Sequence, residues 1–529
     1  QNSRLQTLTL PALRGNFTDS EGVPIATTVM ARNVTVDPKL ITDPAGTAAA
    51  LSPILGIPVE TIIASLTVDS RFSYVAKRIT PDTWKLVSEL GIPGVFSEPT
   101  TNRVYPNGNL AASVVGYVGA EGTGLGGLEF GFNDQLMGQD GKLTVERVNG
   151  REIPASERQS IDPVNGLSVR LTLDSNLQAM LEKSLGDQVI ATGAEGGVAV
   201  IMEPGTGNIL AMATYPTFDP NNPFATDDKS KRNTAVTDVF EPGSTSKVMT
   251  MASVIEEGGA NAGTQYTVEN RISRGGTSFK DYVDHPTLRL TLAGVLAKSS
   301  NIGTIMASES IGEKKLYEYL QKFGIGQSTG MNFPGESGGK LPDINNENEW
   351  SDTTFPTLAF GQGLSVNAVQ TTSVFATIAN DGVRMLPRLI AGYSNTEGVY
   401  EPTMIDEGVR VVSPETAKTV REMLEGVVSE DGTAKNMQIP GYRVGGKTGT
   451  ANRYDEATGG YSGYTSSFIG MAPAEKPALV MSVSIHNPKT STYGSVVAGP
   501  VFKKVMTYAL AHKKVPPSTT KPPKLPVEW

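Results

Sequence analysis

The chain has 529 residues, 38% of them hydrophobic and 19% charged, with a net charge of −9, so it can form two or three folded domains. This composition excludes a disordered chain, and the acidic balance argues against a nucleic-acid partner, which would need a basic surface. Cysteine is absent, which excludes disulfides, thiol catalysis and cysteine-ligated metals.

The three histidines, His285, His486 and His512, are scattered along the chain. None has a neighbour at the spacing of a zinc site or a catalytic triad, so we expect each histidine to be structural. We therefore expect no metal and no cofactor. No apolar run approaches the length of about 18 residues that a membrane-spanning helix requires.

Residues 1–165 combine short β-like runs, turns and glycine-rich stretches without a visible catalytic grouping. Gly122, Gly124 and Gly127 match the G-x-G-x-x-G pattern of dinucleotide-binding proteins. No alternation of strands and helices surrounds them, so a glycine-rich turn explains the pattern better. A domain boundary is predicted near residues 162–166, where Asp, Pro, Asn and Gly interrupt the chain.

From residue 166 onward, strand and helix patterns alternate. Apolar residues at every second position predict a strand over 167–173, and Asp174 is a suitable N-cap for the helix that follows. The later predicted elements are a β-hairpin over 198–214, a helix that begins at Ser413-Pro414, paired strands over 467–471 and 478–485, and a helix through 501–509. This order fits an α+β fold, with helices before, between and after the strands of an antiparallel sheet. Residues 516–529 are predicted to be an extended, mobile tail rich in Pro and Lys.

A serine and a lysine three residues apart, Ser244 and Lys247, stand at the start of a predicted helix. Residues at i and i+3 project from the same helix face, so a potential base lies beside a potential nucleophile without any histidine. The same S-x-x-K spacing recurs at residues 337–340, which are glycine-rich, and at 518–521 in the tail. Only the first copy precedes a run of helical periodicity, over residues 248–255, so we prefer it.

The spacing S-x-N occurs twice beyond that helix, at Ser299/Asn301 and at Ser365/Asn367. The first pair interrupts two apolar stretches within residues 290–307, as a loop between two helices would. The second pair precedes another helical pattern and is expected to be structural. We therefore assign Ser299 and Asn301 to the candidate site.

The tripeptide K-T-G occurs once, at residues 447–449. Residues 441–448 also match the phosphate-binding loop G-x-x-x-x-G-K-[ST]. That loop needs a buried strand before it and a helix after it, so that backbone N–H groups surround the phosphates. Pro440 precedes the match and glycines follow at 459–460, which makes a helix there improbable. A nucleotide-binding ATPase is thus the weakest alternative.

The ordered trio S-x-x-K, S-x-N and K-T-G resembles the active-site motifs of penicillin-binding proteins and class A β-lactamases. Over nearly its whole length, the chain resembles the class B penicillin-binding proteins, which are monofunctional peptidoglycan transpeptidases, and most of all their division-type branch. Residues that match the landmarks of their non-catalytic pedestal are Arg14-Gly15, Phe17, Asp19, Gly22, Ala26, Arg103-Val104-Tyr105-Pro106 and Gly127-Leu128-Glu129. The first 165 residues do not resemble the glycosyltransferase domain of class A relatives, and secreted β-lactamases lack a pedestal.

This resemblance implies three regions. Residues 1–165 would form an N-terminal pedestal of the dimerisation type, a mixed, β-rich domain. Residues 166–515 would form the penicillin-binding transpeptidase domain, which has the serine β-lactamase-like fold of an antiparallel sheet flanked by helices. Residues 516–529 would form the tail.

A serine hydroxyl attacks a carbonyl only when a base takes its proton. Lys247 can be that base only if its amine is neutral for part of the time, which burial and the positive charge of Lys447 would both favour. The resemblance implies further roles. Ser244 would be the nucleophile, Ser299 a proton relay, and Asn301 a group that orients Lys247 and binds the substrate backbone. The terminal carboxylate would be held by the substrate-binding strand with Lys447, Thr448, Gly449 and Thr450, and the oxyanion hole would be formed by the backbone N–H groups of Ser244 and Thr450.

The substrate implied by the resemblance is a peptidoglycan stem peptide that ends in D-Ala-D-Ala, and β-lactams would acylate the same serine. The resemblance also implies a single N-terminal membrane anchor outside this chain and a catalytic domain outside the bacterial cytoplasm. As partners it implies a membrane glycosyltransferase and other division proteins. Three alternatives stay open: an elongation-type transpeptidase, a D,D-carboxypeptidase, and a non-catalytic β-lactam sensor or scaffold.

Overall fold

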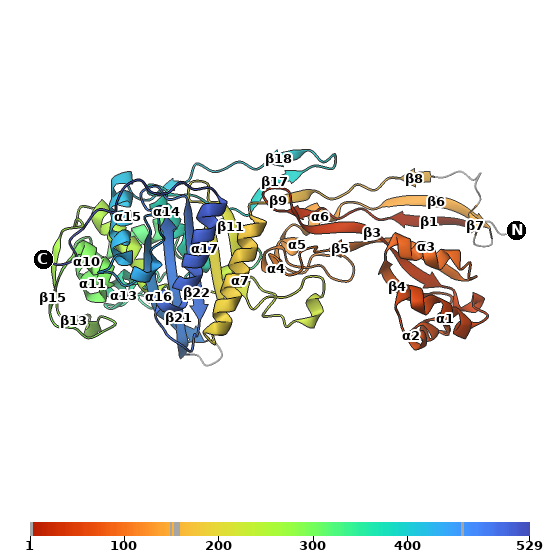
Figure 1. Cartoon of the computed structure of the whole chain (residues 1–529), viewed down its shortest axis with the longest axis horizontal. Coiled ribbons are helices and arrows are strands. Elements are labelled where there is room, and N and C mark those ends of the chain that lie inside the picture. Colours follow the sequence, from red (N-terminus) through yellow and green to blue (C-terminus); the bar gives the residue numbers. More distant parts are fainter. Residues whose placement is uncertain (1–3, 149–150, 153–158, 456–459) are drawn as a thin grey trace.

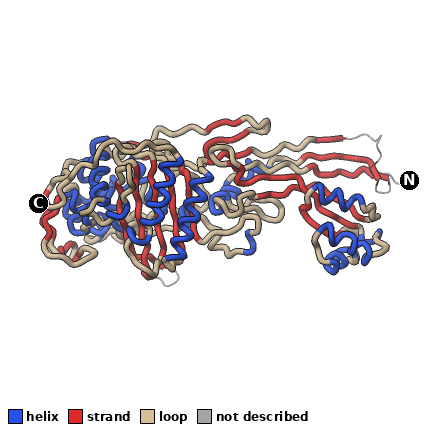
Figure 2. The backbone as a smooth tube through the Cα atoms, in the orientation of Figure 1, coloured by secondary structure: helices blue, strands red, loops and turns tan. Residues whose placement is uncertain are grey.

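The computed structural model of the protein describes residues 4–148, 151–152, 159–455 and 460–529. The molecule is elongated, with the N-terminal strands at one end and a layered α/β body at the other (Figure 1). Long strands dominate the N-terminal part, whereas helices surround the central sheet of the C-terminal part (Figure 2). Within the described residues, no helix has both the length and the apolar character that crossing a membrane would require.

Antiparallel strands build the N-terminal part. The strands of its outer end are β1 (Arg4–Leu10), β6 (Gly141–Val148), β7 (Arg151–Glu152) and β8 (Gln159–Ile161), with β6 paired to each of the others. The longest strand, β3 (Pro24–Val36), pairs with β4 (Ser73–Ile79) and β5 (Val95–Val104). The helices α1 (Pro44–Leu55), α2 (Val59–Leu66) and α3 (Pro81–Glu89) complete a lobe with a small core of its own around Val34, Leu51 and Ile62.

One sheet continues from the N-terminal part into the C-terminal part. β2 (Phe17–Thr18) pairs in parallel with β9 (Ser168–Leu171), and β9 pairs on its other side with β17 (Ile390–Ser394), which carries β18 (Tyr400–Pro402). The side chains of Phe17 and Val169 belong to the same hydrophobic core as the central sheet. The predicted boundary near residue 165 therefore lies next to a shared sheet, and the division of the chain at that residue stays a prediction.

Three of the N-terminal sequence landmarks meet at one buried carboxylate. Glu129, on the short helix α5 (Gly127–Gly131), is fully buried. Its two oxygens accept hydrogen bonds from Arg14 Nε and Arg103 Nε, each at 2.7 Å, and one also accepts from the Tyr105 hydroxyl at 3.0 Å. Buried charges are tolerated when they are paired and hydrogen-bonded in this way. The cluster joins β5 and α5 to the segment that enters β2.

We expect Glu129→Ala to lower the free energy of unfolding by about 3–5 kcal/mol, because it leaves two buried guanidinium groups without their counter-charge. Thermal unfolding of the whole chain measures the effect. Asp187→Ala is the matched control, since it removes an exposed carboxylate that pairs with Lys183 on one helix turn. That control should leave the melting temperature nearly unchanged. Equal melting temperatures for the two variants would contradict a structural role for the Glu129 cluster.

The C-terminal part is built on a five-stranded antiparallel sheet. Its strand order is β11 (Ile209–Tyr215), β10 (Gly196–Met202), β22 (Leu479–His486), β21 (Gly460–Ala472) and β20 (Gly445–Asp455). The predicted hairpin over 198–214 and the predicted strand pair over 467–485 are confirmed as β10–β11 and β21–β22. β20 occupies the end of the sheet, so one of its edges is available for a ligand.

Helices cover both faces of this sheet. α7 (Ser175–Ala191) and α17 (Gly499–His512) pack against each other on one side, and α14 (Ala368–Ala379) lies on the other (Figure 1). Asp174 caps α7 and Ser413 caps α15 (Pro414–Val428), with Pro414 in its first turn, as predicted. The remaining helices of this part are α8 (Thr234–Thr237), α9 (Lys247–Glu256), α10 (Leu292–Lys298), α11 (Asn301–Glu309), α12 (Gly312–Lys322), α13 (Thr354–Ala359) and α16 (Gly494–Val497). The N-terminal part adds α4 (Ala112–Val115) and α6 (Asn133–Met137).

Three small strand pairs complete the C-terminal part. They are β12 (Gln265–Val268) with β15 (Leu288–Thr291), β13 (Arg271–Arg274) with β14 (Thr277–Lys280), and β16 (Val383–Arg384) with β19 (Val409–Arg410). The first two pairs lie next to the helices that carry the S-x-N loop.

The C-terminal tail is extended, as predicted, but it is docked on the protein rather than mobile. Ser518 N donates to Gly441 O at 2.9 Å, and Thr291 N donates to Val527 O at 3.0 Å. The chain ends against β15, where Trp529 N donates to Arg289 O at 3.2 Å. The Pro and Lys content of the tail predicted mobility. The docking could not be foreseen because the partners of the tail, a loop before β20 and the strand β15, are distant in sequence.

Candidate active site

Ser244 lies on a tight turn at the edge of β20. The turn is the 3-10 helix η3 (Gly243–Ser246), and α9 continues directly from it at Lys247. Gly243 has φ +56°, and a Cβ there would lie 3.0 Å from Thr450 O, so this position requires glycine. In a 3-10 turn the side chains at i and i+3 eclipse each other, which places Ser244 and Lys247 on one face. The predicted helix start is thus confirmed.

Lys247 is fully buried below that turn. Its Nζ donates to the backbone carbonyl oxygen of Ser299 at 2.7 Å and to Ser299 Oγ at 3.2 Å. Burial lowers the pKa of Lys247 from 10.5 to about 7, although the negative charge of Asp281 acts in the opposite direction. A substantial share of this amine is therefore neutral at physiological pH, which is the state that a base requires.

Ser299 connects two helices, as the sequence predicted. It lies between α10 and α11 in a left-handed conformation, with φ +60°. Its hydroxyl also accepts a hydrogen bond from Lys447 Nζ at 2.9 Å. Lys447 is fully buried on β20, and burial together with the positive charge of Lys247 holds its pKa well below the usual range. One hydroxyl thus bridges two buried amines that come from different parts of the sequence.

The K-T-G residues lie in strand β20, with Lys447 opposite Ile469 and Thr450 opposite Ser466 of β21. The strand continues through Asp455, where a phosphate-binding loop would need a helix, so that alternative is wrong. A Cβ on Gly449 would lie 2.8 Å from the side chain of Thr245. Glycine at this position therefore lets the strand approach the turn that carries the serine.

Asn301 lies at the first position of α11, and its side-chain amide donates to Lys280 O at 3.1 Å. The sequence predicted that this amide orients Lys247. In the structure that function falls to Ser299, whose carbonyl and hydroxyl oxygens both accept from the Lys247 amine. The amide is held instead by the carbonyl at the end of β14, a contact that spacing along the sequence cannot show.

Residues from each of the three motifs border one cleft of about 340 Å³, the motif cleft. Its lining includes Ser244, Ser299, Asn301, Thr448, Gly449 and Thr450. The Thr450 hydroxyl donates to Thr492 O at 2.8 Å, and Thr448 Oγ1 lies 3.2 Å from Thr433 Oγ1. The two lysines lie buried beneath the bridging hydroxyl of Ser299. The cleft therefore combines an accessible serine with a buried, partly neutral amine.

The second S-x-N pair is structural, as predicted. Asn367 caps α14, its side chain accepts from Gln370 N, and Gln370 Oε1 accepts from Asn367 N, each at 2.8 Å. This reciprocal pair is a capping box, which explains the residue types at these positions without a catalytic role.

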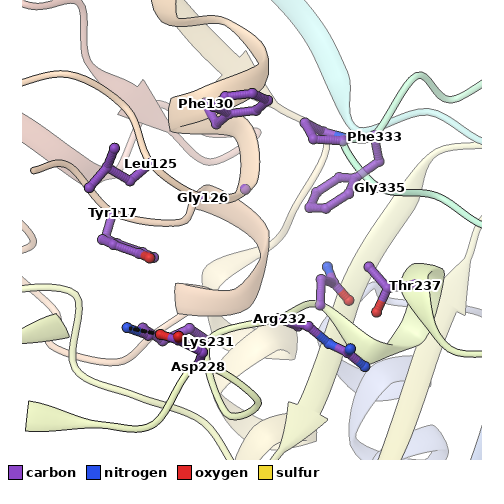
Figure 3. A pocket seen from close by; sticks show the side chains of 13 residues that line it. Tyr117, Leu125, Gly126, Phe130, Asp228, Lys231, Arg232, Thr237, Phe333 and Gly335 are labelled. Atoms are coloured by element: carbon purple, nitrogen blue, oxygen red, sulfur yellow. Dashed lines mark ion pairs between the residues drawn. The ribbon is translucent and has the colours of Figure 1, made fainter. Parts of the chain in front are cut away.

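A second cavity, of about 400 Å³, lies between the N-terminal and C-terminal parts (Figure 3). Tyr117, Leu125 and Phe130 line it from one side and Lys231 from the other, and none of the motif residues borders it. The Lys231 ammonium pairs with Asp228 at 2.7 Å and lies 5.3 Å from the Tyr117 ring centroid. Its charge is thus already matched within this cavity.

Residues that sequence reasoning missed also border the motif cleft. Tyr282 and Tyr493 pack edge to face with ring centroids 5.7 Å apart, and the Tyr282 hydroxyl lies 3.0 Å from Thr492 Oγ1. Asp281 and His285 lie on the same loop as Tyr282, and His285 had been expected to be only structural. No motif marks these residues, because their roles depend on a loop that closes one side of the cleft.

In the part of the chain that the structure describes, no group of three or more His, Asp or Glu side chains could hold a metal ion.

Comparisons with known proteins identify the family. The family of penicillin-binding protein transpeptidase domains matches residues 197–507, and the family of penicillin-binding protein dimerisation domains matches residues 9–171. Penicillin-binding protein PbpB of Mycolicibacterium smegmatis is 34% identical over 98% of this chain and 86% of its own length. Peptidoglycan D,D-transpeptidase FtsI of Escherichia coli is 32% identical over 95% of this chain and 84% of its own length.

Solved structures show the same fold. The crystal structure of penicillin-binding protein 3 from Mycobacterium tuberculosis, complexed with aztreonam, matches with a TM-score of 0.77 at 31% identity, over 98% of this chain and 100% of that chain. Fold and site thus define a transpeptidase domain of the penicillin-binding type preceded by a dimerisation domain. The chain belongs to the class B penicillin-binding proteins, as the sequence predicted.

Proposed function

We propose that this protein is a serine-type peptidoglycan D,D-transpeptidase that cross-links stem peptides through an acyl-enzyme on Ser244 and is acylated there by β-lactams. The observation that carries the proposal is the bridge between Lys247 Nζ, Ser299 Oγ and Lys447 Nζ, at 3.2 and 2.9 Å, beside the serine that lines the same cleft. Membership of the family supports the reaction class.

In the first step, the neutral amine of Lys247 takes the Ser244 Oγ proton while Oγ bonds to the carbonyl carbon of the penultimate D-alanine. The oxyanion that forms is stabilised by the backbone N–H groups of Ser244 and Thr450, donors that are typically worth about 3–4 kcal/mol each. The intermediate then collapses, the peptide C–N bond breaks, and the leaving nitrogen takes a proton from the Ser299 hydroxyl. Lys247, within hydrogen-bond distance of that hydroxyl, returns the proton to it.

In the second step, an amine of a neighbouring stem peptide attacks the acyl-enzyme, and the same groups act in reverse. Lys447, Thr448 and Thr450 hold the terminal carboxylate of the donor by charge-assisted hydrogen bonds, and Gly449 lets the peptide lie along β20. Asn301 contacts the substrate backbone. A β-lactam resembles the D-Ala-D-Ala end, and opening of its ring leaves the acyl group on Ser244.

Within the family, we propose the division-type role, with a membrane glycosyltransferase and other division proteins as partners of the pedestal. We also propose a single membrane anchor outside this chain and a catalytic domain outside the cytoplasm. The alternatives are an elongation-type enzyme, a D,D-carboxypeptidase and a non-catalytic sensor.

A D-Ala-D-Ala stem peptide supplied with a D-amino acid as acceptor tests the activity. We expect wild-type protein to release D-alanine and to form the ligated peptide, and Ser244→Ala to do neither. Release of D-alanine with only the hydrolysed peptide would assign a carboxypeptidase instead. Penicillin labelling without any turnover of the peptide would favour the sensor.

A further inference from the structure

The loop of residues 281–287, between β14 and β15, forms one wall of the motif cleft and begins with a buried carboxylate. The side chain of Asp281 is only 9% exposed. Its Oδ1 accepts from Ile302 N at 2.9 Å, and its Oδ2 accepts from Ser300 Oγ at 2.8 Å. His285 Nε2 lies 2.9 Å from the same Oδ2. Three groups thus fix one carboxylate.

Two of those groups belong to the start of α11. Ser300 is the N-cap of this helix, where its hydroxyl accepts from Gly303 N at 2.9 Å while it donates to Asp281. A carboxylate at a helix N-terminus is favoured, because it accepts from free N–H groups and faces the positive end of the helix dipole. The residue directly before the cap is Ser299. The Asp281 carboxylate therefore anchors the helix start directly beside the hydroxyl that bridges the two lysines.

His285 holds this carboxylate in place. Its Nδ1 lies 2.7 Å from Pro286 O, and its Nε2 faces Asp281 Oδ2. The ring therefore bridges the loop backbone and the carboxylate. The His285 backbone N–H also donates to Asn270 Oδ1 at 3.0 Å, which ties the loop to the end of β12.

We propose that Asp281, held by His285, is a positioning residue for acylation, which fixes the S-x-N loop and supplies a negative charge that acts on Lys247. The proposal rests on the proposed function of Ser244 and Lys247. The titratable groups that face this carboxylate are His285 of its own loop, whose Nε2 lies 2.9 Å from Oδ2, and Lys247 of α9, on which the Asp281 charge acts. Lys298, at the end of α10, lines the same cleft.

The variant Asp281→Asn separates charge from geometry. The amide oxygen can accept from Ile302 N, and the amide nitrogen can donate to Ser300 Oγ and, once the His285 ring carries its proton on Nδ1, to His285 Nε2. The same contacts therefore remain possible, with Ser300 and His285 as acceptors instead of donors, while the charge is lost. Because the Asp281 charge opposes the lowering of the Lys247 pKa, its removal favours the neutral amine.

The test is the rate of acylation by fluorescent penicillin between pH 5 and 9. We expect Asp281→Asn to move the acidic limb of the profile to lower pH by about one pH unit. Asp284→Asn, the same change at an exposed position of the same loop, should leave the limb unchanged. Ser300→Ala keeps the charge but removes the cap, so we expect slower labelling at every pH without a shift.

Folding of each variant is checked by its melting temperature. Asp281→Ser is a second uncharged replacement, and it must shift the limb in the same direction. An unshifted limb in either folded variant, or an equal shift in Ser300→Ala, would overturn the proposal. Wild-type protein that is not labelled at all would instead overturn the proposed function, so the two failures are distinguishable.

Discussion

Ser244→Ala is expected to abolish covalent labelling of the protein by fluorescent penicillin, with a loss of about 10⁶-fold in acylation rate. The reason is that the Ser244 hydroxyl is the group that forms the ester, and no neighbouring hydroxyl can replace it without a change of geometry. Labelling is followed over time in a denaturing gel, at antibiotic concentrations that label the wild type within minutes.

The matched control is Ser246→Ala, two residues further along the same turn. The Ser246 side chain is buried, and its Oγ has no hydrogen-bond partner within the described part of the chain. Its removal should therefore leave labelling at the wild-type rate. A Ser244→Ala variant that is labelled as fast as the wild type would show that another residue is the nucleophile.

Lys247→Met should reduce the acylation rate by about 10²–10⁴-fold, which is the usual contribution of a positioned general base. Methionine is nearly as long as lysine and apolar, so it can occupy the fully buried site without the cost of a buried charge. We expect the variant to fold and to melt no lower than the wild type. Lys314→Met, on the exposed surface of α12, is the control and should be labelled normally.

The same base determines the pH dependence. The pKa of Lys247 is about 7, and only the neutral amine accepts the serine proton, so wild-type acylation should rise through about pH 7 and then level off. Lys247→Met should lose that rising limb along with most of its rate. If the variant were slower but kept the limb, the titrating base would be another group, and Lys447 would be the first candidate.

Local structure was predictable wherever a short pattern has one physical explanation. Ser413-Pro414 indicated a helix start because serine caps N-terminal N–H groups and proline fits the first turn, and α15 begins there. The turn between β10 and β11 and the loop at Ser299 followed from interruptions of apolar runs. The three motifs were assigned to one site by their order, and they do border one cleft.

What the sequence could not supply are contacts between distant segments. The Asn301 amide donates to Lys280 O, at the end of β14, because this strand packs against α11. His285 lies at the cleft because its Nε2 contacts the carboxylate of Asp281, four residues earlier, and no motif marks either residue. The tail after Pro516 docks on β15, a strand more than 200 residues earlier in the chain, as the contact from Thr291 to Val527 shows. Each of these contacts joins segments that only the folded chain brings near.

The most direct measurement is peptide mapping by mass spectrometry after brief exposure of the wild-type protein to benzylpenicillin. We expect a single adduct with the mass of the intact antibiotic, on the peptide that contains Ser244, and none in Lys247→Met over the same time. An adduct on Ser299 or on any serine outside the η3 turn would contradict an acylation site built from Ser244 and Lys247, and so would a folded wild-type protein without an adduct.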